Sequence, residues 1–355
     1  MAILGESFLG VNSENGFTSL YREFAALRAR VFVIKGGPGT GKSTLMRKIA
    51  QAACDKGLDV ELLHCSSDPA SLDAVYILQT NTCILDGTPP HVVEPPLPGA
   101  VGDLIDLYPF WDRAVLAAQT ETIRQINSQL SNLYARTYLY LGAAGRLQRD
   151  LIGIGSSLLN RAKLGGYTDR LCARYIRTRL GTPQEEKRFF SAVTPDGLTF
   201  YPPNRPDMEK QLVIEDEYGL MSRMLEAVRV RALKANHRVL CGYSPLIPDR
   251  ITQLILPQAG LSLCLSNSLH RQPAQPYCRI NASRFLDTAT EACHREKLSF
   301  LRKSRDELLR EASQLLAQCH AEHDRLEACY RPAVDFKALD AYTETLYPRI
   351  LSNTP

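Results

Sequence analysis

Residues 31–50, VFVIKGGPGTGKSTLMRKIA, decide the fold class of this chain. The apolar run at 31–34 is typical of a buried strand, and apolar residues recur at helical spacing beyond position 44. Between the two patterns lies GGPGTGKS, residues 36–43, which fits the motif G-x-x-x-x-G-K-[ST]. A strand, a glycine-rich loop and a helix in this order predict a phosphate-binding P-loop in an α/β fold.

Glycines in such a loop let the backbone turn successive N–H groups toward an anion, and the following helix directs its positive end to the same place. We therefore expect a nucleoside triphosphate to bind here with Mg²⁺. Lys42 is predicted to act in catalysis by stabilising charge on the transferred phosphoryl group, and the Ser43 hydroxyl to bind Mg²⁺. The predicted nucleotide-binding residues are Gly36, Gly37, Pro38, Gly39, Thr40, Gly41, Lys42, Ser43 and Thr44.

A second ligand for the metal is predicted at the end of a neighbouring strand. In TCILDGTPPH, residues 82–91, a buried-strand pattern ends at Asp86, just before a turn. We assign Asp86 to Mg²⁺, bound through water; a carboxylate that only caps the turn is the alternative. Many ATPases place a glutamate after this aspartate to activate water, but the residue here is Gly87. The general base is therefore not identified.

The segment HCSSDP, residues 64–69, follows another strand pattern and offers a further catalytic candidate. Asp68 is predicted to face the γ-phosphate, because ligands of open α/β sheets gather at the carboxyl ends of the strands. Turn chemistry explains Ser-Ser-Asp-Pro equally well. His64 and His91 are expected to be structural rather than catalytic.

Composition excludes several classes of protein. The chain has 355 residues, enough for two or three domains, and its 42 Lys and Arg nearly balance its 38 Asp and Glu. Its start lacks the basic residues of a secretory signal, and no run of eighteen apolar residues occurs, so we expect a cytoplasmic protein without a membrane span. Ten cysteines without a C-x-x-C pair indicate reduced thiols rather than disulfides or a zinc framework.

The second half of the chain resembles the first. DVELLHCSSDP (59–69) aligns with RVLCGYSPLIP (238–248), and at the same shift TCILDGTPPH (82–91) aligns with LSLCLSNSLH (261–270). With a two-residue deletion, SFLGVNSENGFT (7–18) also aligns with RFFSAVTPDGLT (188–199). Three matches in the same order predict a duplication.

The same shift places the glycine-rich loop over residues 215–222, where no loop glycine is retained and Met221 stands in place of Lys42. Three carboxylates then occupy the phosphate position, and Leu265 replaces Asp86. Because these like charges repel a nucleotide, the second unit is predicted not to bind one.

Two long helical segments separate and follow the predicted units. Apolar residues recur every three or four positions over 112–154, which predicts one long helix or a hairpin bent near Gly142 and Gly145. The tail repeats this pattern from Leu298 to Tyr330. We expect these helices to pack on each other or on the sheets; an arm that binds a protein partner is the alternative. Residues 146–188 carry ten Lys or Arg against four acids. We expect a solvated face here, and a nucleic-acid surface is the alternative that this basic excess allows.

These patterns predict four parts: a P-loop domain at 1–111, a helical arm and basic segment at 112–186, a degenerate repeat at 187–286 and a C-terminal helical arm at 287–355. The predicted fold class is α/β, with tandem P-loop NTPase-like domains, each a mainly parallel sheet flanked by helices, and long helical arms.

Four segments, KGGPGTGKSTLM, HCSSDPASLD, ILDGTPPHVVEPPLPGAVGDLIDLYPFWD and SAVTPDG, together resemble a bacterial family of largely uncharacterised tandem P-loop ATPases or ATP-binding proteins. The resemblance extends over nearly the whole chain and is most specific from Asp86 to Trp111. It implies ATP as the ligand. In that family the second unit often keeps its own P-loop, so its loss here argues against a mechanism that needs two equivalent sites.

The leading hypothesis is a Mg²⁺-dependent ATPase with one functional P-loop, in which hydrolysis moves the helical arms or the second unit. A small-molecule or nucleotide kinase is the first alternative, with Asp68 positioning the acceptor hydroxyl. A non-catalytic switch or scaffold that binds ATP is the second alternative, because the residue after Asp86 is not a glutamate.

Overall fold

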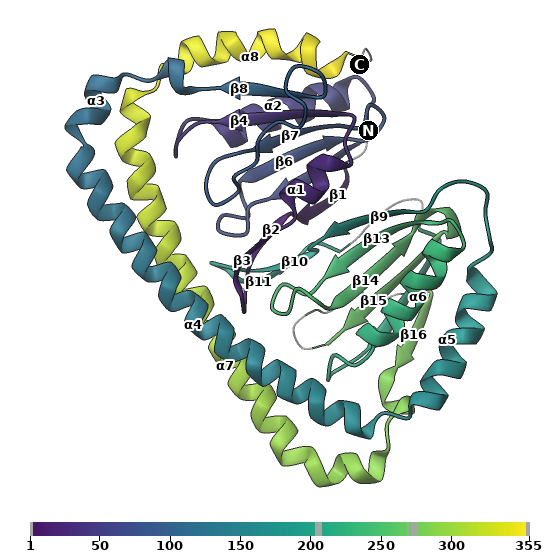
Figure 1. Ribbon diagram of the computed structural model, residues 1–355. Coiled ribbons are helices and arrows are strands. Elements are labelled where there is room, and N and C mark those ends of the chain that lie inside the picture. Colours follow the sequence, from purple (N-terminus) through teal and green to yellow (C-terminus); the bar gives the residue numbers. More distant parts are fainter. Residues whose placement is uncertain (1–2, 203–207, 268–269, 271–275, 353–355) are drawn as a thin grey trace.

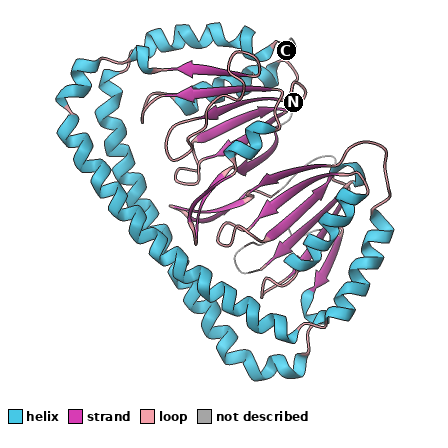
Figure 2. Ribbon diagram, viewed as in Figure 1, coloured by secondary structure: helices cyan, strands magenta, loops and turns pink. Residues whose placement is uncertain are grey.

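The computed structural model describes residues 3–202, 208–267, 270 and 276–352. Two α/β units lie beside a pair of long helices, and the three parts together give the molecule a triangular outline (Figure 1). Each unit is a sheet covered by helices, as Figure 2 shows.

The first unit is built on a six-stranded sheet with the order β1-β5-β6-β7-β4-β8. β6 runs antiparallel to both of its neighbours, and all other pairs are parallel. The central strands are buried, as their continuous apolar runs predict. The strands are β1 (Ile3–Phe8), β4 (Arg30–Lys35), β5 (Val60–His64), β6 (Leu72–Ile77), β7 (Thr82–Asp86) and β8 (Gly102–Asp106).

The second unit has a six-stranded sheet with the order β16-β12-β15-β14-β13-β9, the same arrangement read from the other edge. Here β14 is the antiparallel strand, in the place that β6 takes in the first sheet. The strands are β9 (Gln184–Arg188), β12 (Lys210–Glu215), β13 (Arg238–Tyr243), β14 (Ile251–Leu256), β15 (Leu261–Ser266) and β16 (Cys278–Asn281). β9 begins at Gln184, so the predicted boundary at 187 falls inside this strand.

Smaller elements also correspond between the units. Each unit has a β-hairpin after its first strand. Each also has a helix directly after one corresponding strand, which is β4 in the first unit and β12 in the second. The hairpins are β2 (Gly10–Ser13) with β3 (Gly16–Ser19), and β10 (Ser191–Thr194) with β11 (Gly197–Phe200). The helices are α2 (Lys42–Asp55) and α6 (Ser222–Lys234), and a short α1 (Tyr21–Ala26) precedes β4.

Two long helices, α4 (Thr120–Leu158) and α7 (Thr288–Tyr330), run antiparallel along one side of the molecule (Figure 1). A short α3 (Arg113–Ala118) precedes α4. The two long helices bury a shared apolar seam that includes Ile126, Leu130, Cys319 and Leu326. α4 is continuous through Gly142 and Gly145, so the hairpin alternative is wrong. A Cβ at Gly145 would lie 2.3 Å from the carboxylate of Glu14, and this close approach explains the glycine.

Each of the two long helices is followed by a shorter helix, and the two shorter helices complete the cores of different units. α5 (Arg161–Tyr175) follows α4 and packs in the core of the second sheet with α6. α8 (Phe336–Leu351) follows α7 and packs in the core of the first sheet with α2. The predicted segments 112–186 and 287–355 therefore each contribute both a long helix and part of a sheet core.

The two sheets meet at their edge strands, β1 and β9. The backbones of Phe8 and Phe189 form an antiparallel bridge with N···O distances of 2.7 and 3.0 Å. Beside it, the buried guanidinium of Arg188 donates to both oxygens of Glu61 at 2.9 and 3.0 Å and to Glu186 at 3.1 Å. Arg28 also bonds to Glu186. This ionic network joins the first sheet to the second.

Within the described residues, no helix combines the length and apolar character needed to cross a membrane.

Candidate nucleotide site

The glycine-rich loop lies between the end of β4 and the start of α2, as predicted. β4 occupies an interior place in the sheet, between β7 and β8. Because the loop follows the end of β4, it leaves the sheet at the carboxyl end of this strand. Gly39 and Gly41 have φ values of +66° and +81°, which residues with a Cβ rarely adopt. The glycines are therefore required for the shape of the loop.

Lys42 is the first residue of α2, and its ammonium group is folded into the loop. Its Nζ donates to the carbonyl oxygens of Gly36 and Gly37 at 3.0 and 2.8 Å. The same Nζ lies 3.6 Å from Oδ2 of Asp86. The structure thus brings together the predicted phosphate-binding lysine, at the start of α2, and the predicted metal-binding carboxylate, at the end of β7.

Asp86 ends β7, and its backbone pairs in parallel register with Ile34 of β4. Its Oδ1 accepts hydrogen bonds from the N–H and the hydroxyl of Thr88 at 2.9 and 2.6 Å. One oxygen therefore anchors the turn after the strand, and Oδ2 is directed to Lys42. Oδ1 therefore performs the turn-capping role, and the metal role of Asp86 stays a prediction.

Ser43 and Asp86 supply an oxygen donor set of the kind that Mg²⁺ prefers. Oγ of Ser43 accepts the N–H of Leu72 at 2.9 Å, which fixes the hydroxyl on the first turn of α2 and leaves a lone pair for a cation. Thr44, also predicted to bind nucleotide, has an exposed side chain. The residues present therefore fit a nucleotide with Mg²⁺.

The far end of α7 covers the glycine-rich loop, which the sequence did not predict. A Cβ at Gly37 would lie 2.9 Å from Trp111 and 3.1 Å from Tyr330. A Cβ at Gly39 would lie 3.1 Å from both Cβ and the carbonyl oxygen of Glu327. Glu327 and Tyr330 are remote in the chain from the glycines that they contact, so no local pattern indicates the contact.

His323 lies on the same part of α7. Burial lowers its pKa, the charge of Glu327 opposes this effect, and the positive charge of Lys42 adds to it. The close approach of Glu327 to Gly39 places this turn of α7 beside the glycine-rich loop. In addition, the indole N–H of Trp111 is buried and has no hydrogen-bond partner in the described part of the chain.

Asp68 lies in the turn between β5 and β6. Its Oδ1 accepts the N–H of Ala70 at 3.1 Å, and its carbonyl oxygen accepts the N–H of Ser71 at 2.8 Å. These bonds are those of a turn residue. Its catalytic role stays a prediction.

The corresponding loop of the second unit is offset by one position from the expected alignment. Lys35 and Glu215 end β4 and β12, and Lys42 and Ser222 begin α2 and α6, so the two loops are equal in length. Ser222, and not Met221, therefore stands in the place of Lys42. Gly219, with φ of +73°, corresponds to Gly39, so the expectation that every loop glycine is lost is wrong.

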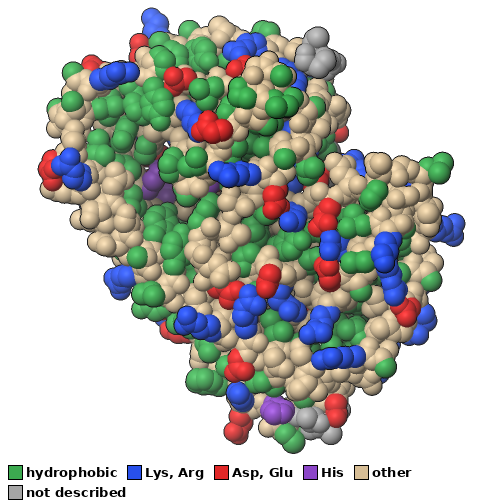
Figure 3. Space-filling view, viewed as in Figure 1, with side chains coloured by type: hydrophobic (Ala, Val, Ile, Leu, Met, Phe, Trp, Pro, Cys, Tyr) green, Lys and Arg blue, Asp and Glu red, His purple; other side chains and the backbone are tan. Residues whose placement is uncertain are grey.

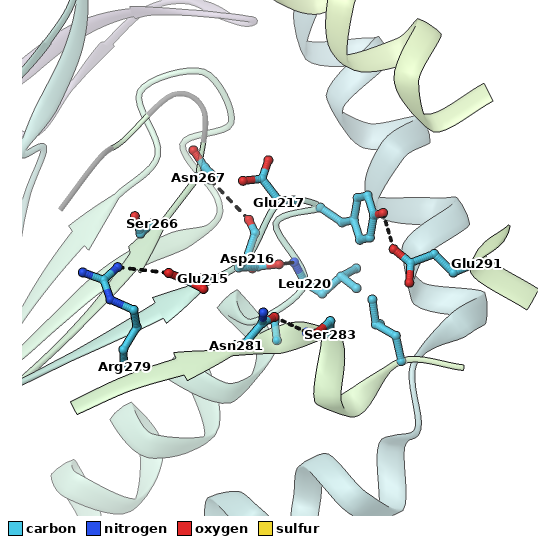
Figure 4. Close-up of a pocket in the computed structure, with 13 residues that line it drawn as sticks. Glu215, Asp216, Glu217, Leu220, Ser266, Asn267, Arg279, Asn281, Ser283 and Glu291 are labelled. Carbon is cyan, nitrogen blue, oxygen red and sulfur yellow. Dashed lines mark hydrogen bonds and ion pairs between the residues drawn. The ribbon is translucent and has the colours of Figure 1, made fainter. Parts of the chain in front are cut away.

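A carboxylate of the protein fills the anion position of this second loop. Asp216, only 1 % exposed, accepts the N–H groups of Leu220 and Met221 at 2.9 and 2.7 Å. Figure 4 shows its side chain directed at Leu220. Burial raises the pKa of Asp216, and these amide hydrogen bonds oppose the shift.

A cavity of about 600 Å³ adjoins this loop in the second unit (Figure 4). Among the described residues, four carboxylates line it, against one guanidinium, that of Arg279, which is paired with Glu215 at 3.0 Å. Glu291 of α7 accepts the hydroxyl of Tyr218 at 2.5 Å in the same cavity. The acidic lining of this cavity is unsuited to a triphosphate. The carboxylates are those of Glu215, Asp216, Glu217 and Glu291.

Some side chains of the basic segment 146–188 are engaged in ion pairs within the protein. Arg188 is buried in the network between the sheets, and Arg149 pairs with Glu14 and Asp249. On the face shown in Figure 3, basic and acidic side chains are interspersed.

One comparison with known proteins gave a match. A family model described as an AAA domain matches residues 14–72, which include β4, the glycine-rich loop and α2. The searches of curated proteins and of solved structures found no match. Together with the geometry above, the family match supports a nucleotide-binding P-loop ATPase domain in this part of the chain.

Proposed function

We propose that this protein is a Mg²⁺-dependent ATPase with one functional P-loop. The observation that carries the proposal is the convergence at one sheet edge of the glycine-rich loop, Lys42 and Asp86, with 3.6 Å between the ammonium nitrogen and the carboxylate oxygen. This combination binds a triphosphate through backbone N–H groups, one lysine and a cation held by oxygen ligands.

Each residue has a defined task in this proposal. The loop amides and the start of α2 bind phosphate oxygens, and Lys42 exchanges its bonds to the carbonyls of Gly36 and Gly37 for bonds to phosphate. Ser43 and Asp86 hold Mg²⁺, which neutralises phosphate charge when bound. Because these groups are already oriented by the fold, catalysis is mainly positional and electrostatic.

We also propose that the chain is a tandem of two P-loop-type units, of which the second no longer binds nucleotide. When Lys42 is aligned with Ser222, the amides of Leu220 and Met221 correspond to those of Thr40 and Gly41. In the second unit Asp216 occupies these amides, so the anion position already contains a negative charge. A phosphate would have to displace this carboxylate.

The proposed output is movement of the long helices. One end of α7 contacts the glycine-rich loop through Glu327 and Tyr330, and the other end contacts the second loop through Glu291. A change at the nucleotide site is therefore applied directly to a helix that reaches the second unit. A protein partner that binds the outer faces of α4 and α7 is part of this proposal.

A nucleotide-dependent switch with little hydrolysis is the second candidate. A Cβ at Gly87 would lie 2.3 Å from the side chain of Val33 and 3.0 Å from the carbonyl oxygen of Val93. The position therefore has no room for the glutamate that activates water after Asp86 in many ATPases. This packing favours slow hydrolysis. The kinase alternative is less favoured, because Asp68 is engaged in its own turn.

The test compares ATP binding and phosphate release by the full chain with those of Lys42→Ala, and Ser222→Ala is the matched control in the second unit. Loss of a hydrogen bond to a charged group costs about 1.5–3 kcal/mol, so Lys42→Ala should weaken ATP binding by about 10- to 150-fold. Ser222→Ala should bind as the wild type. Binding without phosphate release would select the switch, and equal binding by Lys42→Ala and the wild type would refute the site.

A further inference from the structure

Three side chains of different chemistry meet in the interior of the first unit, and the proposed nucleotide chemistry uses none of them. The Sγ of Cys65, a carboxylate oxygen of Asp73 and a ring nitrogen of His91 all lie within 4.8 Å of one another. Cys65 follows β5, Asp73 lies on β6 and His91 lies in the loop after β7. The tertiary fold therefore assembles this cluster from three separate segments.

Asp73 is a carboxylate buried with little compensation. It is 5 % exposed, its Oδ2 lies 3.3 Å from Nε2 of His91, and it accepts the hydroxyl of Tyr21 at 2.7 Å. Among the described residues, its one ion-pair partner is His91. Burial raises the pKa of Asp73, because its charged form is poorly solvated there. A bound divalent cation would supply the missing charge.

The surroundings of Cys65 favour a thiolate once a cation is present. Burial and the negative charge of Asp73 raise the pKa of this thiol well above its ordinary value, whereas the backbone N–H groups of Ser67 and Asp68 lower it. A metal ion would overcome the remaining effect of burial and displace the thiol proton to solvent.

The orientation of His91 is also fixed before any metal binds. Its ring packs against Tyr21 and Phe17 with centroid distances of 4.7 and 5.1 Å, and its backbone N–H donates to Thr88 at 2.8 Å. Its Nδ1 is buried and has no hydrogen-bond partner in the described part of the chain. No hydrogen bond at Nδ1, within the described residues, fixes which ring nitrogen carries the proton, and Nε2 faces Asp73.

We propose that Cys65, Asp73 and His91 bind Zn²⁺ through Sγ, a carboxylate oxygen and Nε2, with water in the fourth position. A mixed set of one thiolate, one imidazole and one carboxylate is typical of zinc rather than of Mg²⁺ or Ca²⁺. In a tetrahedral site with bonds of about 2.1 Å, ligand atoms lie roughly 3.5 Å apart. The separation between Asp73 and His91 already agrees with this value.

The second unit provides an internal comparison. The backbone pair His64 with Leu72 corresponds to Tyr243 with Ile251, so Ser244 and Thr252 take the places of Cys65 and Asp73. His270, the counterpart of His91, is retained, and burial lowers its pKa to about 4. The second unit therefore keeps a neutral buried histidine without the other two ligands. Among the residues that the structure describes, the full set belongs to the unit with the intact P-loop.

The proposed zinc site is connected to both predicted Mg²⁺ ligands. Leu72, next to Asp73, donates its N–H to Ser43, and Thr88, which accepts the N–H of His91, donates to Asp86. Zinc would hold together the two segments that orient the magnesium ligands. The zinc proposal does not depend on ATP binding, since the three ligands lie outside the P-loop.

The experiment measures zinc in the full chain purified under reducing conditions without chelator, and then replaces zinc by Co²⁺. We expect about one zinc ion per chain and, with Co²⁺, a thiolate charge-transfer band together with the intense visible absorption of a tetrahedral site. Cys65→Ser and His91→Gln should each weaken zinc binding by about 100-fold or more. The matched controls Cys54→Ser and His270→Gln should retain the metal, and Lys42→Ala should retain it as well.

A second readout does not depend on folded variants. Zinc should protect Cys65 of the wild-type chain from alkylation, located by mass spectrometry, and should leave the reactivity of Cys54 unchanged. Absence of both zinc and the cobalt thiolate band in the wild type would overturn the proposal. So would zinc that is retained by Cys65→Ser and His91→Gln, or alkylation of Cys65 that zinc does not slow.

Discussion

The ionic network between the two sheets gives a direct prediction for stability. Arg188 is 2 % exposed and forms two hydrogen bonds with Glu61, which otherwise accepts only the hydroxyl of Ser7 at 2.8 Å among the bonds described. In Arg188→Met, Glu186 retains Arg28, but Glu61 becomes a largely buried carboxylate without its arginine partner. Removing one partner of a buried ion pair costs about 3–5 kcal/mol. We expect a loss of this size in the free energy of unfolding.

Urea unfolding, followed by circular dichroism and by the fluorescence of Trp111, measures this loss. Arg124→Met is the matched control, because its ion pair with Glu121 is exposed and worth about 0–1 kcal/mol. Adding Glu61→Gln to Arg188→Met removes the unpaired charge and should restore at least half of the loss. A loss below about 1 kcal/mol, the value of an exposed pair, or a further decrease on adding Glu61→Gln, would refute the reasoning.

Three further predictions concern charge and backbone geometry. Burial would raise the pKa of Glu186, but Arg188 and Arg28 lower it to about 2 from an ordinary value of 4.5. The stabilisation of about 3 kcal/mol is therefore present above pH 4.5 and lost as the pH falls toward 2. Urea unfolding at several pH values should show this loss, and Glu186→Gln should remove this pH dependence. Asp216→Ala leaves two buried N–H groups without a partner and should cost about 1–3 kcal/mol in urea unfolding, whereas a change in ATP affinity would contradict the one-site proposal. Gly39→Ala should destabilise the protein more than Gly57→Ala, measured by thermal unfolding, because both glycines have positive φ but only Gly39 contacts α7; equal losses would show that this contact is unimportant.

Local patterns were sufficient for several parts of the candidate site. The strand, the loop and the helix at 31–50 follow from hydrophobic periodicity and from the backbone freedom of glycine, which are properties of neighbouring residues. The position of Asp86 beside β4 follows from one further rule, that a buried apolar run ends at the carboxyl edge of a parallel sheet. The structure agrees with it, since Asp86 pairs with Ile34.

Sequence self-similarity located the second unit but not its register. The loops of the two units align at one shift, and the strands after the loops align at a shift that differs by a single position. Weakly similar segments do not define where along the chain the shift changes. The backbone decides it, because Gly219 shares the positive φ of Gly39. The role of Asp216 was also misjudged: its carboxylate binds the loop amides, so it does not act only by repelling phosphate.

The sequence alone determined that a phosphate-binding loop exists near the amino end and that long amphipathic helices follow each sheet, because neighbouring residues carry those signals. Only the tertiary structure decided that α7 returns to cover this loop and that Cys65, Asp73 and His91 meet. Such contacts depend on how complete elements pack, and residues far apart in the chain carry no local pattern that records their meeting.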